Sequence, residues 1–182
     1  MSNGLVMISG CSGGGKSTVL AELKARGHAV VEEPGRRIIA EVTANGGAAL
    51  PWVDLAAFLR RAIEMALADR LAAERHQGWV FFDRGLVDAA SALEALTGDP
   101  VLRPLCMTRR YHFRMFMAPP WPEIYVTDAD RKHGFDTAVA EYDRLMAAFP
   151  ALGYEVIALP KTSPAQRADL MLACLNDASG MS

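Results

Sequence analysis

A glycine-rich stretch near the start of the chain, residues 10–18, reads GCSGGGKST and matches the phosphate-loop pattern G-x-x-x-x-G-K-[ST]. It lies between a short apolar run, Leu5–Ser9, and a segment in which apolar residues recur at helical spacing. In this order of strand, loop and helix, the glycines can turn backbone N–H groups toward an anion at the positive end of the helix. We therefore predict a site for the phosphates of a nucleotide, formed by Gly10, Cys11, Ser12, Gly13, Gly14, Gly15, Lys16, Ser17 and Thr18.

Two side chains of this loop are suited to ATP and Mg²⁺, which we expect as the cofactors. Lys16 carries a mobile positive charge that can reach the β- and γ-phosphates. The Ser17 hydroxyl can bind the Mg²⁺ that bridges those phosphates. A glycine-rich turn with a chance lysine is the alternative, but it leaves the strand before the loop and the helix after it unexplained.

The composition limits the size and the partners of the protein. With 182 residues, of which 51% are hydrophobic, the chain can fill the core of one α/β domain, which we expect to span residues 1–182. The net charge is −2 and no basic run is present, so we expect neither nucleic acid nor an anionic membrane surface as a partner. The longest helical candidate, Trp52–His76, is interrupted by charged residues, which excludes a membrane span.

The three cysteines, Cys11, Cys106 and Cys174, are widely spaced and form no C-x-x-C pair. This pattern indicates neither a disulfide framework nor a zinc site, and it fits a reducing compartment. The first residues lack the basic and apolar regions of a signal peptide. We therefore expect a cytoplasmic protein.

Apolar runs alternate with segments of helical periodicity, which predicts an α/β fold with a parallel sheet flanked by helices. The expected strands are Leu5–Ser9, Ala29–Glu32, Trp79–Asp83, Phe113–Met117 and Tyr154–Leu159. The expected helices after the phosphate loop span residues 36–42, 52–76, 87–96, 100–110, 135–149 and 164–175.

The fourth strand has two candidates, Phe113–Met117 and Ile124–Thr127. We favour the first because Pro119 and Pro120 follow it and provide a natural exit from a strand. Residues 119–134 then form a long connection with little apolar periodicity, which is typical of a lid rather than a packed element.

Charged residues lie at the carboxyl ends of the second and third expected strands, which is where ligands bind in an open parallel sheet. Asp83 has the form of the acid that holds Mg²⁺ opposite Ser17, although a helix-capping aspartate is an alternative. Glu33 can deprotonate or orient an acceptor hydroxyl, or it is a solvated loop acid. A shift of one residue in the register of this strand would give that role to Glu32.

Arg84 follows Asp83 at the position where motor-type ATPases normally carry a second acid that activates water. Its presence favours transfer of phosphate to a bound acceptor over hydrolysis. We therefore include Arg84 among the catalytic candidates, together with Lys16, Glu33 and Asp83.

Taken together, GCSGGGKST, the VVEEP strand end, FFDRG and an arginine-containing lid resemble the nucleoside- and ribosylnicotinamide-kinase-like branch of the P-loop proteins. Members of the closest group are often labelled AAA-type ATPases. The resemblance covers roughly residues 3–176, and within it the phosphate loop is the one specific motif.

The resemblance implies a five-stranded sheet in the order 2-3-1-4-5 and transfer of the γ-phosphate of Mg·ATP to a hydroxyl of a small, nucleoside-like metabolite. Glu33-Pro34 resembles the Glu-Pro pair of deoxynucleoside kinases, in which the glutamate serves the acceptor hydroxyl. Asp83-Arg84-Gly85 resembles their acid-Arg-Ser segment, with glycine in place of serine. Arg131 and Lys132 occupy the place of the lid cations that grip the transferring phosphate, where the family usually has two arginines.

Two other functions compete with a kinase. One is a nucleotide-dependent regulatory ATPase that hydrolyses slowly and signals through its lid, and the absence of a second acid beside Asp83 counts against it. The other is a module that binds a phosphorylated ligand without catalysis.

Overall fold

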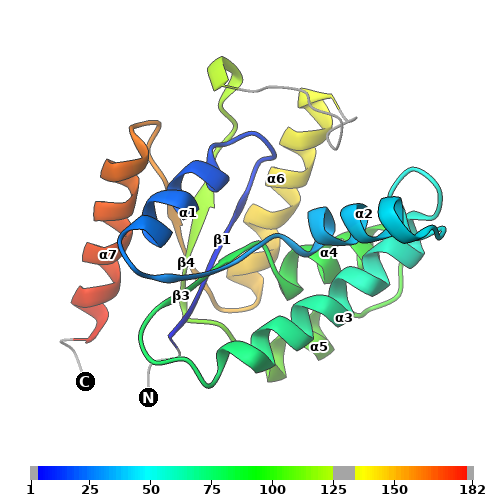
Figure 1. The fold of residues 1–182 in the computed structure, drawn as a ribbon, viewed down its shortest axis with the longest axis horizontal. Helices are drawn as coiled ribbons and strands as arrows, with labels where there is room; N and C mark the ends of the chain where they lie inside the picture. Colours follow the sequence, from blue (N-terminus) through cyan, green and yellow to red (C-terminus); the bar gives the residue numbers. More distant parts are fainter. Residues whose placement is uncertain (1–3, 125–133, 180–182) are drawn as a thin grey trace.

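Strand β1 (Leu5–Gly10) lies at the centre of a parallel sheet in the computed structural model, which describes residues 4–124 and 134–179 (Figure 1). Within these residues five strands pair in the order β2-β3-β1-β4-β5. The other strands are β2 (Ala29–Val31), β3 (Val80–Asp83), β4 (Arg114–Ala118) and β5 (Glu155–Ala158). The predicted fold class and strand order are confirmed, and so is the choice of residues 113–117 for the fourth strand.

The helices of the described part of the chain fall close to the predicted ranges. They are α1 (Lys16–Ala25), α2 (Pro34–Asn45), α3 (Leu55–Ala73), α4 (Leu86–Thr97), α5 (Leu102–Thr108), α6 (Phe135–Ala151) and α7 (Pro164–Ser179). A short 3₁₀ helix, η1 (Pro122–Ile124), follows β4.

The starts of α2 and α3 differ from the sequence-based ranges for local reasons, and those of α4 and α5 differ by one and two residues. Helix α3 begins at Leu55 rather than Trp52, because the Asp54 side chain accepts a hydrogen bond of 2.9 Å from the N–H of Ala57 and so caps the helix. Helix α2 begins at Pro34, two residues earlier than predicted, since proline is well suited to the first helical position.

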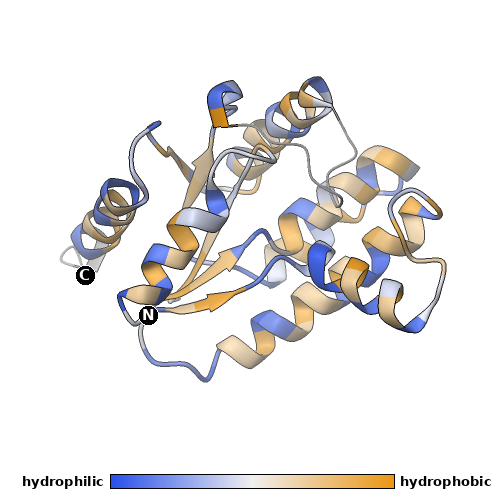
Figure 2. Ribbon diagram, turned by 45° about the horizontal axis from the view of Figure 1, so that its top comes forward, coloured by the Kyte–Doolittle hydropathy of each residue, from blue (hydrophilic) through white to orange (hydrophobic). Residues whose placement is uncertain are grey.

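The central strands β1, β3 and β4 are buried on both faces of the sheet, which explains their continuous apolar runs (Figure 2). On one face, Val6 and Ile8 of β1 belong to an apolar cluster that includes residues of α1 and α7. On the other face, Leu5 and Met7 belong to a larger cluster that includes residues of α2, α3, α4, α5 and α6. The chain is thus a three-layer structure with the sheet in the middle (Figure 1).

Parallel pairing brings the carboxyl ends of the strands to one edge of the sheet. Ile8 of β1 pairs with Asp83 of β3, and Gly10 pairs with Ala118 of β4. The phosphate loop and Asp83 are therefore neighbours, as the sequence predicts. None of the helices in the described residues is long and apolar enough to cross a membrane.

Candidate active site

The phosphate loop begins where β1 runs against β4. Gly10 has a φ of 120°, and a Cβ atom at this position would lie 2.2 Å from the carbonyl oxygen of Ala118. The N–H of Cys11 donates to the same oxygen at 2.9 Å, and the Cys11 side chain is fully buried. Only glycine fits such a close approach, so Gly10 sets the direction in which the loop leaves the sheet.

The loop ends at Gly15, which caps α1 in the left-handed conformation with a φ of 80°. Helix α1 then starts at Lys16, so the free N–H groups of its first turn lie beside the loop. Ser17 and Thr18 are exposed on this turn, and the Thr18 hydroxyl donates to the carbonyl of Gly15 at 2.8 Å. This geometry suits an anion bound by backbone donors.

Arg167 of α7 supports the loop from the other side, and no sequence motif indicated it. Its Nη1 donates to the carbonyl of Gly14 at 2.8 Å, and its Nε donates to the carbonyl of Pro160 at 2.6 Å. The guanidinium lies 4.8 Å from the centre of the Trp121 ring, within cation–π range. Arg167 is 1% exposed, so it fixes the loop as part of the core rather than as a surface contact.

The side chain of Lys16 folds back into the phosphate loop that precedes it. This side chain is buried, and Nζ donates to the carbonyl of Cys11 at 3.1 Å. Burial lowers the pKa of the Lys16 ammonium, and the positive charge of Arg84 lowers it further, whereas Asp83 and Glu33 act in the opposite direction. An anion that binds next to such a desolvated ammonium strongly stabilises its charged form.

Asp83 ends β3 with a carboxylate that is only 9% exposed. Burial raises the pKa of Asp83 to about 6, the charge of Lys16 opposes this shift, and Glu33 adds to it. Its Oδ1 is buried and has no hydrogen-bond partner among the described residues. An unpartnered carboxylate oxygen is unfavourable unless it binds a cation or a proton, so Asp83 fits the predicted role in holding Mg²⁺.

The other protein ligand predicted for Mg²⁺ is the hydroxyl of Ser17, a hard oxygen donor like the Asp83 carboxylate. Within the described residues no group of three or more histidine, cysteine, aspartate and glutamate side chains is arranged to hold a metal ion. Mg²⁺ commonly takes one or two protein ligands and completes its shell with phosphate and water oxygens. The residues present therefore fit Mg²⁺ bound together with a nucleotide.

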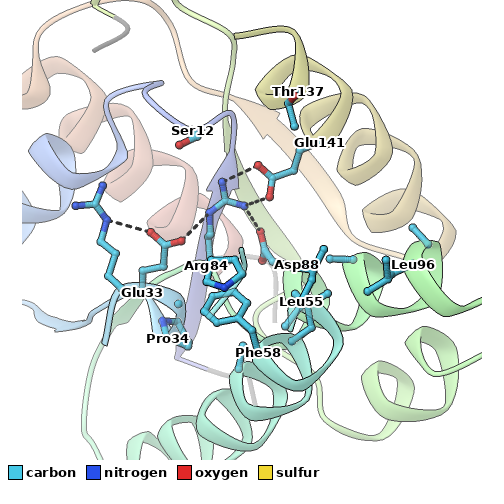
Figure 3. A pocket seen from close by; sticks show the side chains of 18 of the residues that line it. Ser12, Glu33, Pro34, Leu55, Phe58, Arg84, Asp88, Leu96, Thr137 and Glu141 are labelled. Atoms are coloured by element: carbon cyan, nitrogen blue, oxygen red, sulfur yellow. Dashed lines mark hydrogen bonds and ion pairs between the residues drawn. The ribbon is translucent and has the colours of Figure 1, made fainter. Parts of the chain in front are cut away.

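Arg84 is the centre of the charged part of the site (Figure 3). It has a φ of 60°, in the left-handed region that residues other than glycine rarely adopt. Its guanidinium forms a two-point ion pair with Glu141 of α6, at 2.8 and 3.1 Å, and donates to the carbonyl of Gly10 at 3.1 Å. Two further carboxylates, of Glu33 and Asp88, lie 3.4 Å from it.

These carboxylates keep the guanidinium of Arg84 positively charged. Burial opposes that charge, but Glu141, Glu33 and Asp88 outweigh burial and raise the pKa of Arg84. Burial also opposes the negative charge of Glu141, yet Arg84 lowers the pKa of Glu141 below its usual value. The strained backbone of Arg84 is thus held in place by a cluster of opposite charges.

Asp88 has a structural role in this cluster. It accepts hydrogen bonds from the Ser9 hydroxyl and, at 3.1 Å, from the N–H of Gly85. Because these donors and Arg84 already occupy its oxygens, Asp88 is not free to bind a ligand. It connects the end of β1 to the start of α4.

Glu33 and Glu32 face different surroundings. Glu33 is partly buried, lines a cavity and also lies 3.4 Å from Arg36, whereas Glu32 is exposed. The structure therefore places Glu33, and not Glu32, at the site.

The cavity has a volume of about 620 Å³ and adjoins the phosphate loop at Ser12. It lies among α2, α3, α4 and α6, and its wall on the side of the sheet edge includes Glu33, Arg84 and Glu141 (Figure 3). Cavities of this volume hold small organic molecules. The site therefore combines an anion-binding loop with a chamber for a second ligand.

Most of the predicted site residues meet at this edge of the sheet, namely the nine loop residues, Glu33, Asp83 and Arg84. Arg131, Lys132 and most of the predicted lid lie outside the described residues. Sequence reasoning missed Asp88, Glu141 and Arg167. Asp88 stands one helical turn after Arg84, a spacing that was available as a signal, whereas Glu141 and Arg167 belong to no recognisable motif.

The sheet order, the phosphate loop and the acid at the end of β3 define a P-loop nucleoside triphosphatase of the kinase-like type. The chain belongs to a family described as AAA domain, whose model matches residues 5–167. None of the curated proteins compared with the chain matches it.

Several solved structures share the fold at low sequence identity. Deoxyadenosine kinase from M. mycoides with bound dATP matches with a TM-score of 0.61 and 14% identity, over 94% of this chain and 99% of that one. Shikimate kinase from Acinetobacter baumannii in complex with shikimate matches with a TM-score of 0.62 and 12% identity, over 96% and 93% of the two chains. The NadR protein in complex with NAD and AMP-PNP matches with a TM-score of 0.61 and 17% identity, over 98% of this chain and 50% of NadR. The predicted kinase-like P-loop fold is confirmed.

Proposed function

We propose that the protein is an ATP-dependent phosphotransferase that moves the γ-phosphate of Mg·ATP to a hydroxyl of a small metabolite. The observation that carries this proposal is the position of the 620 Å³ cavity, which shares Ser12 with the phosphate loop and has Glu33 and Arg84 in its wall. A second ligand in this cavity would lie next to the phosphates. The kinases among the structural neighbours support the same class of reaction.

Each residue of the site has a role in this reaction. The loop N–H groups and Lys16 bind the phosphates, and Ser17 and Asp83 would hold the Mg²⁺. Glu33 accepts the proton of the acceptor hydroxyl, whose oxygen then forms a bond to the γ-phosphorus. The bond from this phosphorus to the bridging oxygen breaks and ADP leaves. Arg84 neutralises the carboxylates that lie where the cavity meets the phosphate loop. Arg131 and Lys132 are proposed to bind the transferred phosphate.

The sequence resemblance suggests a nucleoside-like acceptor and a cytoplasmic location. All three cysteines are free thiols, which fits a reducing compartment supplied with ATP. A regulatory ATPase is the second candidate, because Arg84 is engaged by three carboxylates and has little freedom to turn to an acceptor.

A screen with γ-labelled ATP tests the proposal. The purified protein is incubated with nucleosides, ribosylnicotinamide, sugar alcohols and simple lipophilic alcohols, and label is followed into organic phosphate and inorganic phosphate. A kinase transfers label to one acceptor faster than to water, and Lys16→Ala and Asp83→Asn abolish this transfer. Label appearing only as inorganic phosphate identifies the regulatory ATPase, and no release at all identifies a binding module.

A further inference from the structure

The wall of the cavity away from the phosphate loop is hydrocarbon. Helix α3 contributes Leu55, Phe58 and Leu59, and helix α4 contributes Ala89, Ala92 and Leu96. Figure 3 shows Leu55 and Phe58 beside the Arg84 cluster and Leu96 further along the cavity. The small alanine side chains leave the space open, and the larger residues line it with apolar surface.

The charged groups of the cavity are concentrated at its other end, and its uncharged polar side chains are those of Ser12, Trp52 and Thr137. The carboxylates of Glu33, Asp88 and Glu141 all face Arg84 at 3.4 Å or less. Of the two other arginines in the wall, Arg36 lies 3.4 Å from Glu33, and Arg144 donates to the Ser91 hydroxyl at 3.1 Å. Within the described residues the lining contains no asparagine, glutamine, histidine or tyrosine.

This distribution is unfavourable for a nucleoside. The edge of a base carries several hydrogen-bonding groups, and each loses its water without a replacement when it meets alanine, leucine or phenylalanine. An anionic acceptor is also disfavoured, because the three arginines of the lining, Arg36, Arg84 and Arg144, are balanced by the three carboxylates, Glu33, Asp88 and Glu141, and leave no net positive charge to offset its desolvation. A neutral molecule with a hydrocarbon body and one hydroxyl meets neither penalty.

We infer that the phosphoryl acceptor is a neutral, lipophilic alcohol, whose hydrocarbon body packs against α3 and α4 while its hydroxyl lies at Glu33. The inference rests on the proposed kinase function for the chemistry and on the cavity for the substrate class. It replaces the nucleoside-like acceptor suggested by the resemblance. Binding by apolar burial predicts a negative heat-capacity change, which a ligand recognised mainly by hydrogen bonds shows to a smaller degree.

Calorimetry with chosen probes measures binding separately from activity. The probes are 4-phenylbutan-1-ol, its methyl ether, adenosine and thymidine, each titrated into the protein with ADP and Mg²⁺. We expect the alcohol to bind at least tenfold more tightly than either nucleoside, with a negative heat-capacity change. The methyl ether should bind within about threefold of the alcohol and accept no phosphate, because most of the affinity comes from the hydrocarbon body.

Variants in the apolar wall locate the binding site. Ala92→Gln introduces an amide at a partly buried position of the cavity and should weaken 4-phenylbutan-1-ol at least tenfold, whereas Ala72→Gln on the exposed side of α3 should not. Leu96→Gln is a second variant that is safe for folding, since Leu96 is 48% exposed, and it should weaken the alcohol at least threefold. Leu71→Gln, at a position 66% exposed and outside the cavity lining, is its control.

The outcomes separate the acceptor class from the reaction. The inference is wrong if adenosine or thymidine binds more tightly than the alcohol, or if the alcohol does not bind. It is also wrong if the cavity variants and their controls have equal effects. Transfer of label to a nucleoside alone overturns it while the kinase proposal stands. Binding of the alcohol as expected, with label released only as inorganic phosphate, supports the inference on the ligand and rejects the kinase.

Discussion

The guanidinium of Arg84 and the carboxylate of Glu141 form a two-point ion pair, with Nη1–Oε1 and Nη2–Oε2 distances of 2.8 and 3.1 Å. The two residues come from different parts of the fold, since Arg84 follows β3 and Glu141 lies in α6. Arg84 also donates to the carbonyl of Gly10 at the start of the phosphate loop. The pair therefore ties α6 to the nucleotide end of the sheet.

Replacing Glu141 by glutamine should cost roughly 1–3 kcal/mol of unfolding free energy, because it removes the charge that pairs best with a buried guanidinium. Glu33 and Asp88 remain as partners of Arg84 and limit the loss. Glu155→Gln is the matched control, since Glu155 pairs with Arg114 at 2.8 Å but its side chain is 51% exposed. Its cost should stay below about 1 kcal/mol. Urea unfolding measures the unfolding free energies of the two variants. Equal losses of unfolding free energy would contradict a special role for the Arg84–Glu141 pair.

Lys16→Met should greatly weaken nucleotide binding without weakening the fold. The lost contacts to phosphate correspond to roughly a hundredfold in affinity, or about two charge-assisted hydrogen bonds of 1.5 kcal/mol each. The folded-state pKa of Lys16 is lowered, so its charged form is less favourable in the folded than in the unfolded protein near neutral pH. The thermal midpoint without ligand should therefore stay the same or rise. A clear fall in this midpoint would show that Lys16 stabilises the empty loop.

Asp83→Asn should stabilise the ligand-free protein in a pH-dependent way. The folded-state pKa of Asp83 is raised from 3.8 to about 6, so its favourable contribution is complete below about pH 4 and is lost as the pH rises to about 6. Above that pH, the substitution should raise the unfolding free energy by about 1–3 kcal/mol, and below pH 4 by almost nothing. Urea unfolding at a series of pH values measures this, with Asp99→Asn, at an exposed position, as the control.

The same variant should lose the response to Mg²⁺. At pH 8, Mg²⁺ added with ATP should stabilise the natural protein much more than Asp83→Asn, because the ionised carboxylate is the proposed ligand. Equal stabilisation of the two proteins by Mg²⁺ would show that Asp83 is not a metal ligand.

Arg167→Lys should weaken nucleotide binding although Arg167 is fully buried behind the loop. Lysine keeps the charge but cannot donate to both Gly14 and Pro160 at once or stack as a plane on Trp121. We expect a fall in ATP affinity of about tenfold, equivalent to one lost hydrogen bond of roughly 1.5 kcal/mol. Calorimetry with ATP checks this value, and an unchanged affinity would mean that Gly14 keeps its position without Arg167.

The parts of the fold that could be predicted are those encoded by neighbouring residues. The apolar runs identified the strands, and the glycine pattern placed Lys16 and Ser17 at the start of a helix. The strand order came from the resemblance to known kinases and not from the strands themselves. Helix starts were displaced where one residue decides them, as Asp54 and Pro34 do.

The parts that could not be predicted depend on tertiary contacts. Glu141 is separated from Arg84 by 57 residues, and Arg167 from Gly14 by 153 residues. No local pattern distinguishes either of them from a surface charge on an amphipathic helix. The cavity is also a property of packing, since its alanines are ordinary helix residues until α3 and α4 are placed next to each other.

The role of Glu33 can be separated from that of its neighbour Glu32 and from that of Asp83. Glu33 lines the cavity and Glu32 is exposed, so Glu33→Gln should reduce transfer of phosphate to the acceptor by roughly a hundredfold or more, the usual contribution of a positioned general base. Nucleotide binding should persist, and so should slow hydrolysis, because water needs no acceptor site. Glu32→Gln is the matched control and should retain full transfer.

Single-turnover assays with γ-labelled ATP measure the rates of transfer and hydrolysis in the same samples. If Glu32→Gln loses transfer while Glu33→Gln keeps it, the acid that serves the acceptor is Glu32. If both variants transfer normally, the acceptor hydroxyl is not activated from the end of β2.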